Sequence, residues 1–103
     1  MIGGYDSKSL TVLAHVKAQP GKEPQVRQAL LSLIGPSRKD AGCVNYDLHQ
    51  AVGNPALFLF HENWASKELL DAHLQTPHVQ AAMAQMVQLV AEPPQITAWE
   101  KIS

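Results

Sequence analysis

An α+β fold is predicted by three features of this 103-residue sequence. Apolar and polar residues alternate in several segments of similar length, which is the period-two pattern of half-buried strands. Between these segments lie stretches whose apolar residues recur every three or four positions, as on one face of a helix. Turns rich in proline and glycine separate the segments. The length suits one domain, which we expect over residues 10–103, after a flexible tail over residues 1–9.

The first half of the chain predicts a strand, an amphipathic helix and a hairpin. The helix carries an apolar stripe from Val26 to Ile34, and Gly35-Pro36 should kink or end it, although a further turn could reach Lys39. The turn between the last two segments is short, so their strands are expected to pair antiparallel. In chain order, the four segments are expected at residues 10–18, 26–34, 43–50 and 56–64.

The second half predicts two helices and a closing strand. Ser66 is suited to cap a short helix over residues 67–74, and Thr76-Pro77 supplies a capping hydroxyl followed by proline at the first helical position. The second helix carries apolar residues as far as Val90, and a proline pair ends it before a strand over residues 95–102. The resulting order of strands and helices, β-α-β-β-α-β, is the ferredoxin-like pattern. It predicts a four-stranded antiparallel sheet with its helices on one face.

The other face of this sheet would expose large apolar side chains. By the alternation of the strands, they are Leu13, Leu57, Leu59 and Trp99. An exposed apolar patch of this kind usually marks an interface. Two such sheets packed face to face would form a closed, twofold-symmetric α/β barrel, so we expect a homodimer.

Composition and motifs exclude several classes of protein. The net charge of −1 provides no concentrated basic patch for a nucleic acid or an anionic membrane. No apolar run approaches the ~20 residues of a membrane span, and the N-terminus lacks the apolar core of a signal peptide. The single cysteine, Cys43, excludes an internal disulfide, suits the cytoplasm and is expected to be a small buried residue. Glycine-rich phosphate loops, CxxC pairs and HExxH are absent, so we expect no cofactor and no metal.

The second strand of the hairpin carries a candidate site. Phe60, Glu62 and Trp64 share one face. If that face looks toward the helices, it lines a pocket together with Tyr46, Leu70, His73 and Met83. A carboxylate among aromatic rings has its pKa raised by desolvation, which suits a general base. The alternative is that Glu62 is simply hydrogen-bonded near the strand end and that the rings are plain core.

Five histidines are many for a chain of this length. His73 ends one short helix and His78 starts the next, so the two are expected close together, either as a proton-handling pair or as capping and packing residues. His15, His49 and His61 fall on the opposite face of the sheet. Strand alternation alone explains that coincidence, and their spacing gives metal binding little support.

Three motifs carry a family resemblance. They are Gly42 to Tyr46, Glu62-Asn-Trp64-Ala-Ser66 and Ala72-His73-Leu-Gln-Thr-Pro77-His78. Together they resemble the antibiotic biosynthesis monooxygenase family, and within it the small quinol monooxygenases. The similarity extends from about Leu10 to Ile102.

The resemblance implies a dimeric α/β barrel with one pocket in each subunit. It also implies a cofactor-independent oxidation of a small phenolic or hydroquinone substrate by O2. The residues expected to handle protons are His73, Glu62 and His78, with Glu62 as the base or as the orienter of His73. Those expected to bind the ring are Trp64, Tyr46, Phe60, Leu70 and Met83.

Three other functions are compatible with the same fold. One is a ligand-binding dimer without catalysis, because a fold does not determine a function. Another is an isomerase of a small phosphorylated signal molecule, but none of its candidate phosphate-binding cations, Arg27, Arg38, Lys67 and Lys17, falls on the expected pocket face. The third is haem degradation, which is disfavoured because Ala14 and Met83 stand where the haem-degrading relatives place an asparagine and a haem-ligating histidine.

Overall fold

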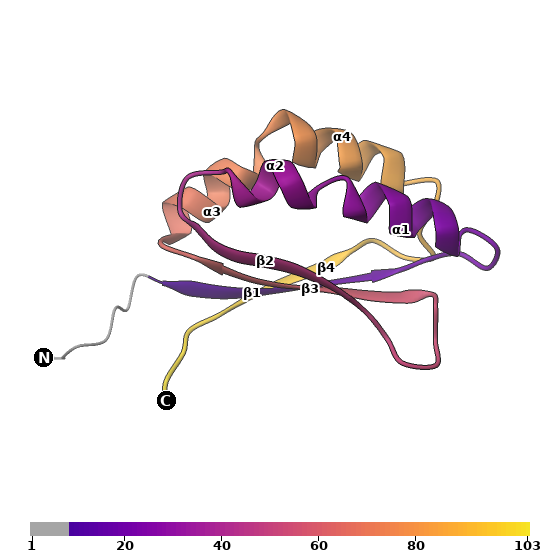
Figure 1. The fold of residues 1–103 in the computed structure, drawn as a ribbon, viewed down its shortest axis with the longest axis horizontal. Coiled ribbons are helices and arrows are strands. Elements are labelled where there is room, and N and C mark those ends of the chain that lie inside the picture. The colour runs from indigo at the N-terminus through magenta and orange to yellow at the C-terminus, as the bar shows by residue number, and fades with distance from the viewer. Residues whose placement is uncertain (1–8) are drawn as a thin grey trace, which may run out of the picture.

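The computed structural model describes residues 9–103, so the expected tail lies, apart from Ser9, outside the described residues. The four strands form one antiparallel sheet in the order β2-β3-β1-β4, and the helices lie together on one of its faces (Figure 1). The ferredoxin-like α+β fold is therefore confirmed. In chain order the elements are β1 (Leu10–Lys17), α1 (Glu23–Leu31), α2 (Ile34–Arg38), β2 (Cys43–Gln50), β3 (Leu57–Trp64), α3 (Lys67–Leu74), α4 (Pro77–Met86) and β4 (Gln95–Trp99).

The break in the first helical region lies earlier than predicted. Helix α1 ends at Leu31, and α2 begins at Ile34 with Gly35 and Pro36 in its first turn. The backbone N–H groups in the first turn of a helix have no acceptor within the helix, so a proline, which lacks this N–H, is tolerated there. The prediction that Gly35-Pro36 would kink or end the helix is wrong in its position, whereas the further turn that could reach Lys39 is present as α2, with Lys39 as its C-cap.

Strand β2 departs from simple alternation at its start. The pairing with β3 shifts between Cys43 and Asn45, which leaves Val44 as an extra residue that is 69% exposed. An inserted residue of this kind is a β-bulge. The residues before the bulge therefore point to the opposite face of the sheet from the one that simple alternation would give them. Cys43, which simple alternation would place on the face opposite to Tyr46, consequently pairs with Trp64 and is packed, partly buried, against the core.

Helices α3 and α4 begin at the predicted caps. The Ser66 hydroxyl accepts a hydrogen bond from the N–H of Leu69, and the Thr76 hydroxyl accepts one from the N–H of Val79. Helix α4 ends at Met86, four residues before the expected Val90, and β4 ends at Trp99 rather than at residue 102. No helix within residues 9–103 has the length and apolarity needed to cross a bilayer.

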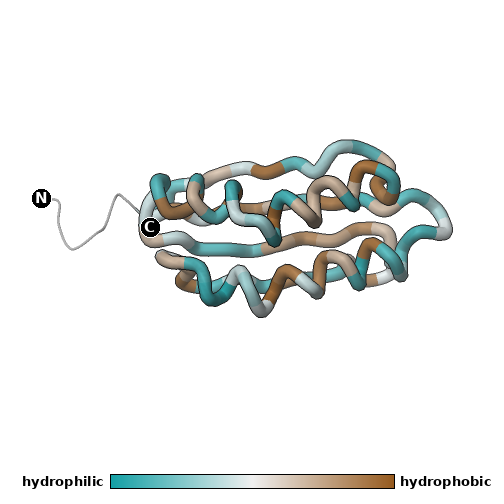
Figure 2. Tube along the Cα trace, turned by 90° about the horizontal axis from the view of Figure 1, so that it is seen from above, coloured by the Kyte–Doolittle hydropathy of each residue, from teal (hydrophilic) through white to brown (hydrophobic). Residues whose placement is uncertain are grey.

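The core lies between the helices and the sheet. From above, the helices form two rows along the sheet, and hydrophobic and hydrophilic residues alternate along them (Figure 2). The predicted stripe of the first helical region is buried from Val26 to Leu33 and partly buried at Ile34. Alternate residues of β3 are buried as well, namely Phe58, Phe60, Glu62 and Trp64. This alternation is what brings Glu62 to the helix side of the sheet.

The opposite face of the sheet has no helix over it (Figure 1). Leu57 and Trp99 are 39% and 55% exposed there, and Leu13 and Leu59 are partly buried. The apolar open face predicted from the sequence is therefore present in the structure.

Candidate active site

A cavity of about 70 Å³ lies between the sheet and the helices. A water molecule needs roughly 10–15 Å³ by a comparable measure, so the space exceeds that of several waters. Three lining side chains can titrate: Tyr46 from β2, Glu62 from β3 and His73 from α3. The others are apolar, namely Val12, Ala14, Val16, Leu30, Leu33, Phe60, Leu74, Val79, Ala82, Met83, Met86, Pro94 and Ile96.

Glu62 is a buried carboxyl in this apolar wall. Glu62 is only 4% exposed, and its Oε1 accepts a hydrogen bond of 2.8 Å from Nε1 of Trp64. Burial raises the pKa of Glu62 to about 7, although the bond from Trp64 opposes the rise. The predicted rise in the pKa of Glu62 is therefore present, and it brings the titration of this carboxyl toward neutral pH.

Two ring residues expected to bind substrate lie on the cavity wall. Tyr46 and Phe60 have ring centroids 4.8 Å apart, and both line the cavity. Burial, aided by the nearby charge of Glu62, raises the pKa of Tyr46 well above its ordinary value. The Tyr46 phenol accordingly stays protonated at neutral pH and can donate a hydrogen bond.

Trp64 and Leu70 lie behind the wall. Trp64 is fully buried and Leu70 is 6% exposed, and neither lines the cavity. The Trp64 ring packs on the imidazole of His73 with centroids 4.4 Å apart. Trp64 thus contacts two of the three titratable groups, Glu62 and His73, from behind the cavity wall. Met83 does line the cavity and is 42% exposed, which places it at the cavity's edge.

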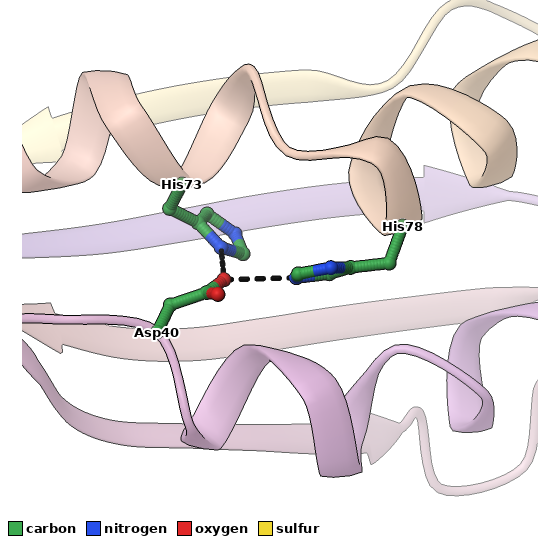
Figure 3. A group of neighbouring side chains, drawn as sticks. All are labelled: Asp40, His73 and His78. Atoms are coloured by element: carbon green, nitrogen blue, oxygen red, sulfur yellow. Dashed lines mark hydrogen bonds and ion pairs between the residues drawn. The ribbon is translucent and has the colours of Figure 1, made fainter.

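His73 and His78 meet at a residue that sequence reasoning missed. Oδ2 of Asp40 lies 2.8 Å from Nδ1 of His73 and 2.8 Å from Nε2 of His78 (Figure 3). The expected closeness of the two histidines is confirmed, with ring centroids 6.1 Å apart. Of the three, only His73 lines the cavity. Glu62, named in advance as a possible orienter of His73, instead pairs with Trp64.

The charges of this group are set by burial and by the shared carboxylate. Burial works to raise the pKa of Asp40, but the hydrogen bonds to His73 and His78 outweigh it and lower the pKa. Burial lowers the pKa of His73, and its bond to Asp40 opposes that change only in part. At neutral pH we therefore treat Asp40 as a carboxylate and His73 as a neutral imidazole.

A glycine turn places Asp40 against helix α3. Gly42 has a φ of +83°, and a Cβ at this position would lie 2.5 Å from Cδ1 of Leu69 in α3. The Gly42 carbonyl accepts a hydrogen bond of 2.8 Å from the N–H of Ala65. The loop that carries Asp40 can approach α3 this closely because Gly42 has no side chain.

Asp40, His73 and His78 are also the donor types of a metal site. Their ligand atoms lie within 4.8 Å of one another, and within residues 9–103 this is the one such group of three. The hydrogen bonds between the three side chains account for the arrangement without an ion. His15, His49 and His61 do not form such a group; Nδ1 of His61 instead lies 3.2 Å from the amide nitrogen of Asn45.

The cavity lining bears on the alternative functions. Both Glu62 and His73 face the cavity, whereas the non-catalytic hypothesis expects them to point away from it or to be sealed by packing. No lysine or arginine is among the lining residues within residues 9–103, so the cationic rim expected of the isomerase is missing there. The two positions that count against haem degradation, Ala14 and Met83, both line the cavity.

Comparisons with known proteins agree with this architecture. The sequence profile of the family described as Antibiotic biosynthesis monooxygenase matches residues 9–85. The Escherichia coli protein named Probable quinol monooxygenase YgiN is 34% identical over 84 residues, covering 70% of this chain and 79% of YgiN. The solved structure of PA3566 from Pseudomonas aeruginosa is 31% identical with a TM-score of 0.89, covering 97% of this chain and 100% of that one. An uncharacterized Synechocystis protein, sll1783, is 29% identical over 88% of this chain, which spans 62% of that relative's length.

Proposed function

Because the chain belongs to the antibiotic biosynthesis monooxygenase family, we propose that it oxidises a small phenolic or hydroquinone substrate with O2 and uses no flavin, haem or metal. The observation that carries the proposal is the cavity, an apolar space with a neutral imidazole and a buried carboxyl in its wall. An apolar wall suits an aromatic ring, and an imidazole can take its hydroxyl proton. An apolar wall also strengthens the electrostatic interactions beside it, because it screens charges poorly.

We assign the base to His73. A neutral imidazole that accepts the substrate's hydroxyl proton becomes an imidazolium, which then pairs with the phenolate it has made. The carboxylate of Asp40, 2.8 Å from Nδ1, stabilises that imidazolium. An ionised Glu62 would repel the phenolate, so its raised pKa favours a protonated carboxyl that donates a hydrogen bond to the anion.

The reaction balances without a cofactor because the substrate supplies the electrons. The phenolate gives one electron to O2, and the substrate radical and superoxide combine at a ring carbon beside the oxygen. His73 returns its proton to give a hydroperoxide. Cleavage of the O–O bond then releases water and leaves a new carbonyl. Hydroquinone and O2 thereby yield hydroxyquinone and water, with one oxygen atom in each product.

Two ionisations should define the pH profile. Activity requires a neutral His73, so it falls when the pH drops below the pKa of His73, which burial lowers from its ordinary 6.5. It also requires a protonated Glu62, so it falls as the pH rises through about 7. We expect a bell-shaped dependence of kcat/KM on pH with an alkaline limb near 7.

The test is oxygen incorporation. Purified protein treated with a chelator is incubated with a panel of hydroquinones under 18O2 and under argon, and products are analysed by mass spectrometry. We expect consumption only with O2 and one labelled oxygen in the product. If no hydroquinone is consumed faster than without protein, the proposal is wrong.

Two variants separate the roles of the titratable groups. His73→Ala should lower kcat by about 10²–10⁴. Glu62→Gln keeps a hydrogen-bond donor, so it should retain kcat within about tenfold and lose the alkaline limb. A Glu62→Gln protein as inactive as His73→Ala would instead make Glu62 the base. Glu68→Gln is the control, because this glutamate of α3 is exposed and lies outside both the cavity lining and the open face of the sheet.

The working unit that we propose is a homodimer. Its support is the open face of the sheet, where Leu13, Leu57, Leu59 and Trp99 form the apolar part. A second copy of the same face would cover these residues and close the two sheets into a barrel.

A further inference from the structure

One carboxylate oxygen holds two histidines. Oδ2 of Asp40 receives both hydrogen bonds, from Nδ1 of His73 and from Nε2 of His78, each at 2.8 Å (Figure 3). The three residues come from separate parts of the chain: the end of the α2 region, the last turn of α3 and the first turn of α4. Asp40 is absent from the cavity wall, whereas His73 is part of it. Asp40 can therefore reach a cavity ligand only through His73.

The shared oxygen decides which ring nitrogens carry protons. An ionised carboxylate accepts hydrogen bonds and donates none, so both nitrogens that face it must be N–H groups. For a neutral His73 this leaves Nε2 without a proton, as the one ring nitrogen that can accept a proton. A neutral histidine in water prefers the opposite tautomer, with its proton on Nε2, and in that form His73 would present a donor to the substrate hydroxyl.

We propose that Asp40 is a positioning residue that holds His73 in its Nδ1–H tautomer, so that Nε2 is ready to accept a proton, and that His78 secures Asp40 from the solvent side. The consequence for turnover rests on the proposed function, whereas the tautomer of His73 does not. His78 is suited to the outer role because its side chain is 24% exposed and contacts the same oxygen, while that of His73 is 3% exposed. A second donor restrains the carboxylate that one imidazole alone would leave free to rotate.

Two substitutions of Asp40, to asparagine and to alanine, should affect the shared hydrogen-bond acceptor differently. Asp40→Asn retains one carbonyl oxygen, which can still accept from both rings, so geometry is kept and the negative charge is lost. Asp40→Ala removes the acceptor altogether. We expect Asp40→Asn to preserve the Nδ1–H tautomer of neutral His73 and to destabilise the protonated, imidazolium form of the same ring. We expect Asp40→Ala to leave His73 as a mixture of both neutral tautomers in which Nε2–H predominates.

Nitrogen-15 NMR of the imidazole rings reads the tautomer directly and requires no substrate. The wild type at pH 7.5 should show His73 with a protonated Nδ1 and an unprotonated Nε2. Asp40→Asn should keep that pattern, and Asp40→Ala should reverse it. Asp71→Asn and Asp71→Ala are the matched controls, because this carboxylate of α3 is exposed and pairs with Lys67. A residue with only a structural role would not move the tautomer.

Kinetics give the second readout. Asp40→Ala should lower kcat by about tenfold to a hundredfold, with KM changed by less than about twofold. Asp40→Asn should lower kcat less and shift the acid limb of the pH profile to lower pH, because the imidazolium has lost its counter-charge. His78→Ala should lower kcat by a few fold and leave the tautomer in place. This variant and Asp40→Asn carry the test if Asp40→Ala does not fold.

Three results would overturn the assignment. The first is a wild-type His73 with its proton on Nε2. The second is an Asp40→Ala protein that folds with tautomer and kcat unchanged. The third is a stoichiometric divalent ion on the three side chains, detected by the absorption of added Co²⁺, because a lone pair rather than a proton would then face Asp40. Inactivity of the wild type toward every hydroquinone would reject the proposed function alone, since the NMR result would still stand.

Discussion

The two faces of the sheet carry similar residues in different surroundings. Leu59 and Phe60 are neighbours on β3, yet Phe60 lies in the wall of the cavity and Leu59 lies on the open face. On the open face, polar residues bond to one another along a short chain: the Thr11 hydroxyl donates to Asn63, and the Asn63 amide donates to Asn45, each at 2.7 Å. On the covered face, the carboxyl of Glu62 stands in an apolar wall with Trp64 as its hydrogen-bond donor. Polar groups that satisfy one another stabilise a surface, whereas a titratable group surrounded by apolar side chains acquires a shifted pKa.

The largest expected effect on stability comes from truncating the covered face. Phe60→Ala should lower the free energy of unfolding by about 3–5 kcal/mol, because it removes a buried ring and enlarges the cavity. Urea denaturation measures the change. Tyr46 loses its ring partner in the same variant, so near-ultraviolet circular dichroism should change as well. A loss below about 1 kcal/mol would mean that the cavity collapses around the gap.

Glu62→Gln should change the dependence of stability on pH. The pKa of Glu62 is about 7 in the folded protein against 4.5 as the ordinary value, so the folded state binds more protons than the unfolded state between these pH values. The stability due to this group is fully present below about pH 4.5 and is lost as the pH rises through 7. A rise from 4.5 to about 7 corresponds to about 3 kcal/mol.

The measurement compares unfolding free energies of wild type and Glu62→Gln at several pH values. Relative to wild type, the glutamine variant should gain about 3 kcal/mol between pH 4.5 and pH 8, because its amide has no charge to bury. Asp47→Asn, a change of the same kind at a carboxylate whose side chain is 46% exposed, is the control and should show no comparable gain. Parallel pH curves for wild type and Glu62→Gln would contradict the perturbed pKa.

Sequence patterns predicted the features of the fold and the site that depend on local periodicity and on helix caps. The period of two along residues 56–64 was sufficient to put Phe60 and Glu62 on the helix side, and the Thr76-Pro77 cap brought His78 near His73. The same reasoning placed Trp64 and Leu70 at the pocket, but it cannot tell a residue in the cavity wall from one just behind it. That distinction depends on how α3 sits on the sheet.

Asp40 was missed for a related reason. It lies 33 residues before His73, in a turn that the sequence marks only as a break between elements. Its contact with His73 depends on the packing of that turn against α3, which no local pattern encodes. The two closely spaced histidines were the available signal, because imidazoles held in a protein interior commonly have an acidic or carbonyl partner. The bulge at Val44 was missed because the residue types of a strand do not reveal that one of its residues has no partner on the neighbouring strand.

A smaller effect is expected at the turn that brings Asp40 to the covered side. Gly42→Ala should cost about 2–3 kcal/mol, which is more than backbone strain alone, because an L-residue at positive φ is strained and its Cβ would in addition collide with Leu69. Gly53→Ala is a matched control, since Gly53 has a φ of +79° with nothing within 4 Å of the added atom. Its cost should be confined to the strain of about 1–2 kcal/mol. The difference between the two variants, measured by urea denaturation, isolates the contact with α3; equal losses would show that the turn yields freely.

The smallest effect on the stability of a single chain is expected from a substitution on the open face. Such a substitution should instead weaken the proposed dimer. Leu59→Asn replaces a partly buried side chain that no helix covers, so the free energy of unfolding of the isolated subunit should change by less than about 1 kcal/mol. The same change places an amide in the centre of the proposed dimer interface, where a buried polar group without a partner is costly.

Light scattering coupled to size-exclusion chromatography, over a hundredfold range of concentration, should find twice the chain mass for wild type and the chain mass for Leu59→Asn. Gln50→Ala, at the exposed end of β2, should remain dimeric. A wild type of single-chain mass at every concentration would reject the dimer. If Leu59→Asn is monomeric and still oxidises hydroquinones, the covered face of one subunit suffices for the chemistry. If it is monomeric, folded and inactive, turnover requires the assembled dimer.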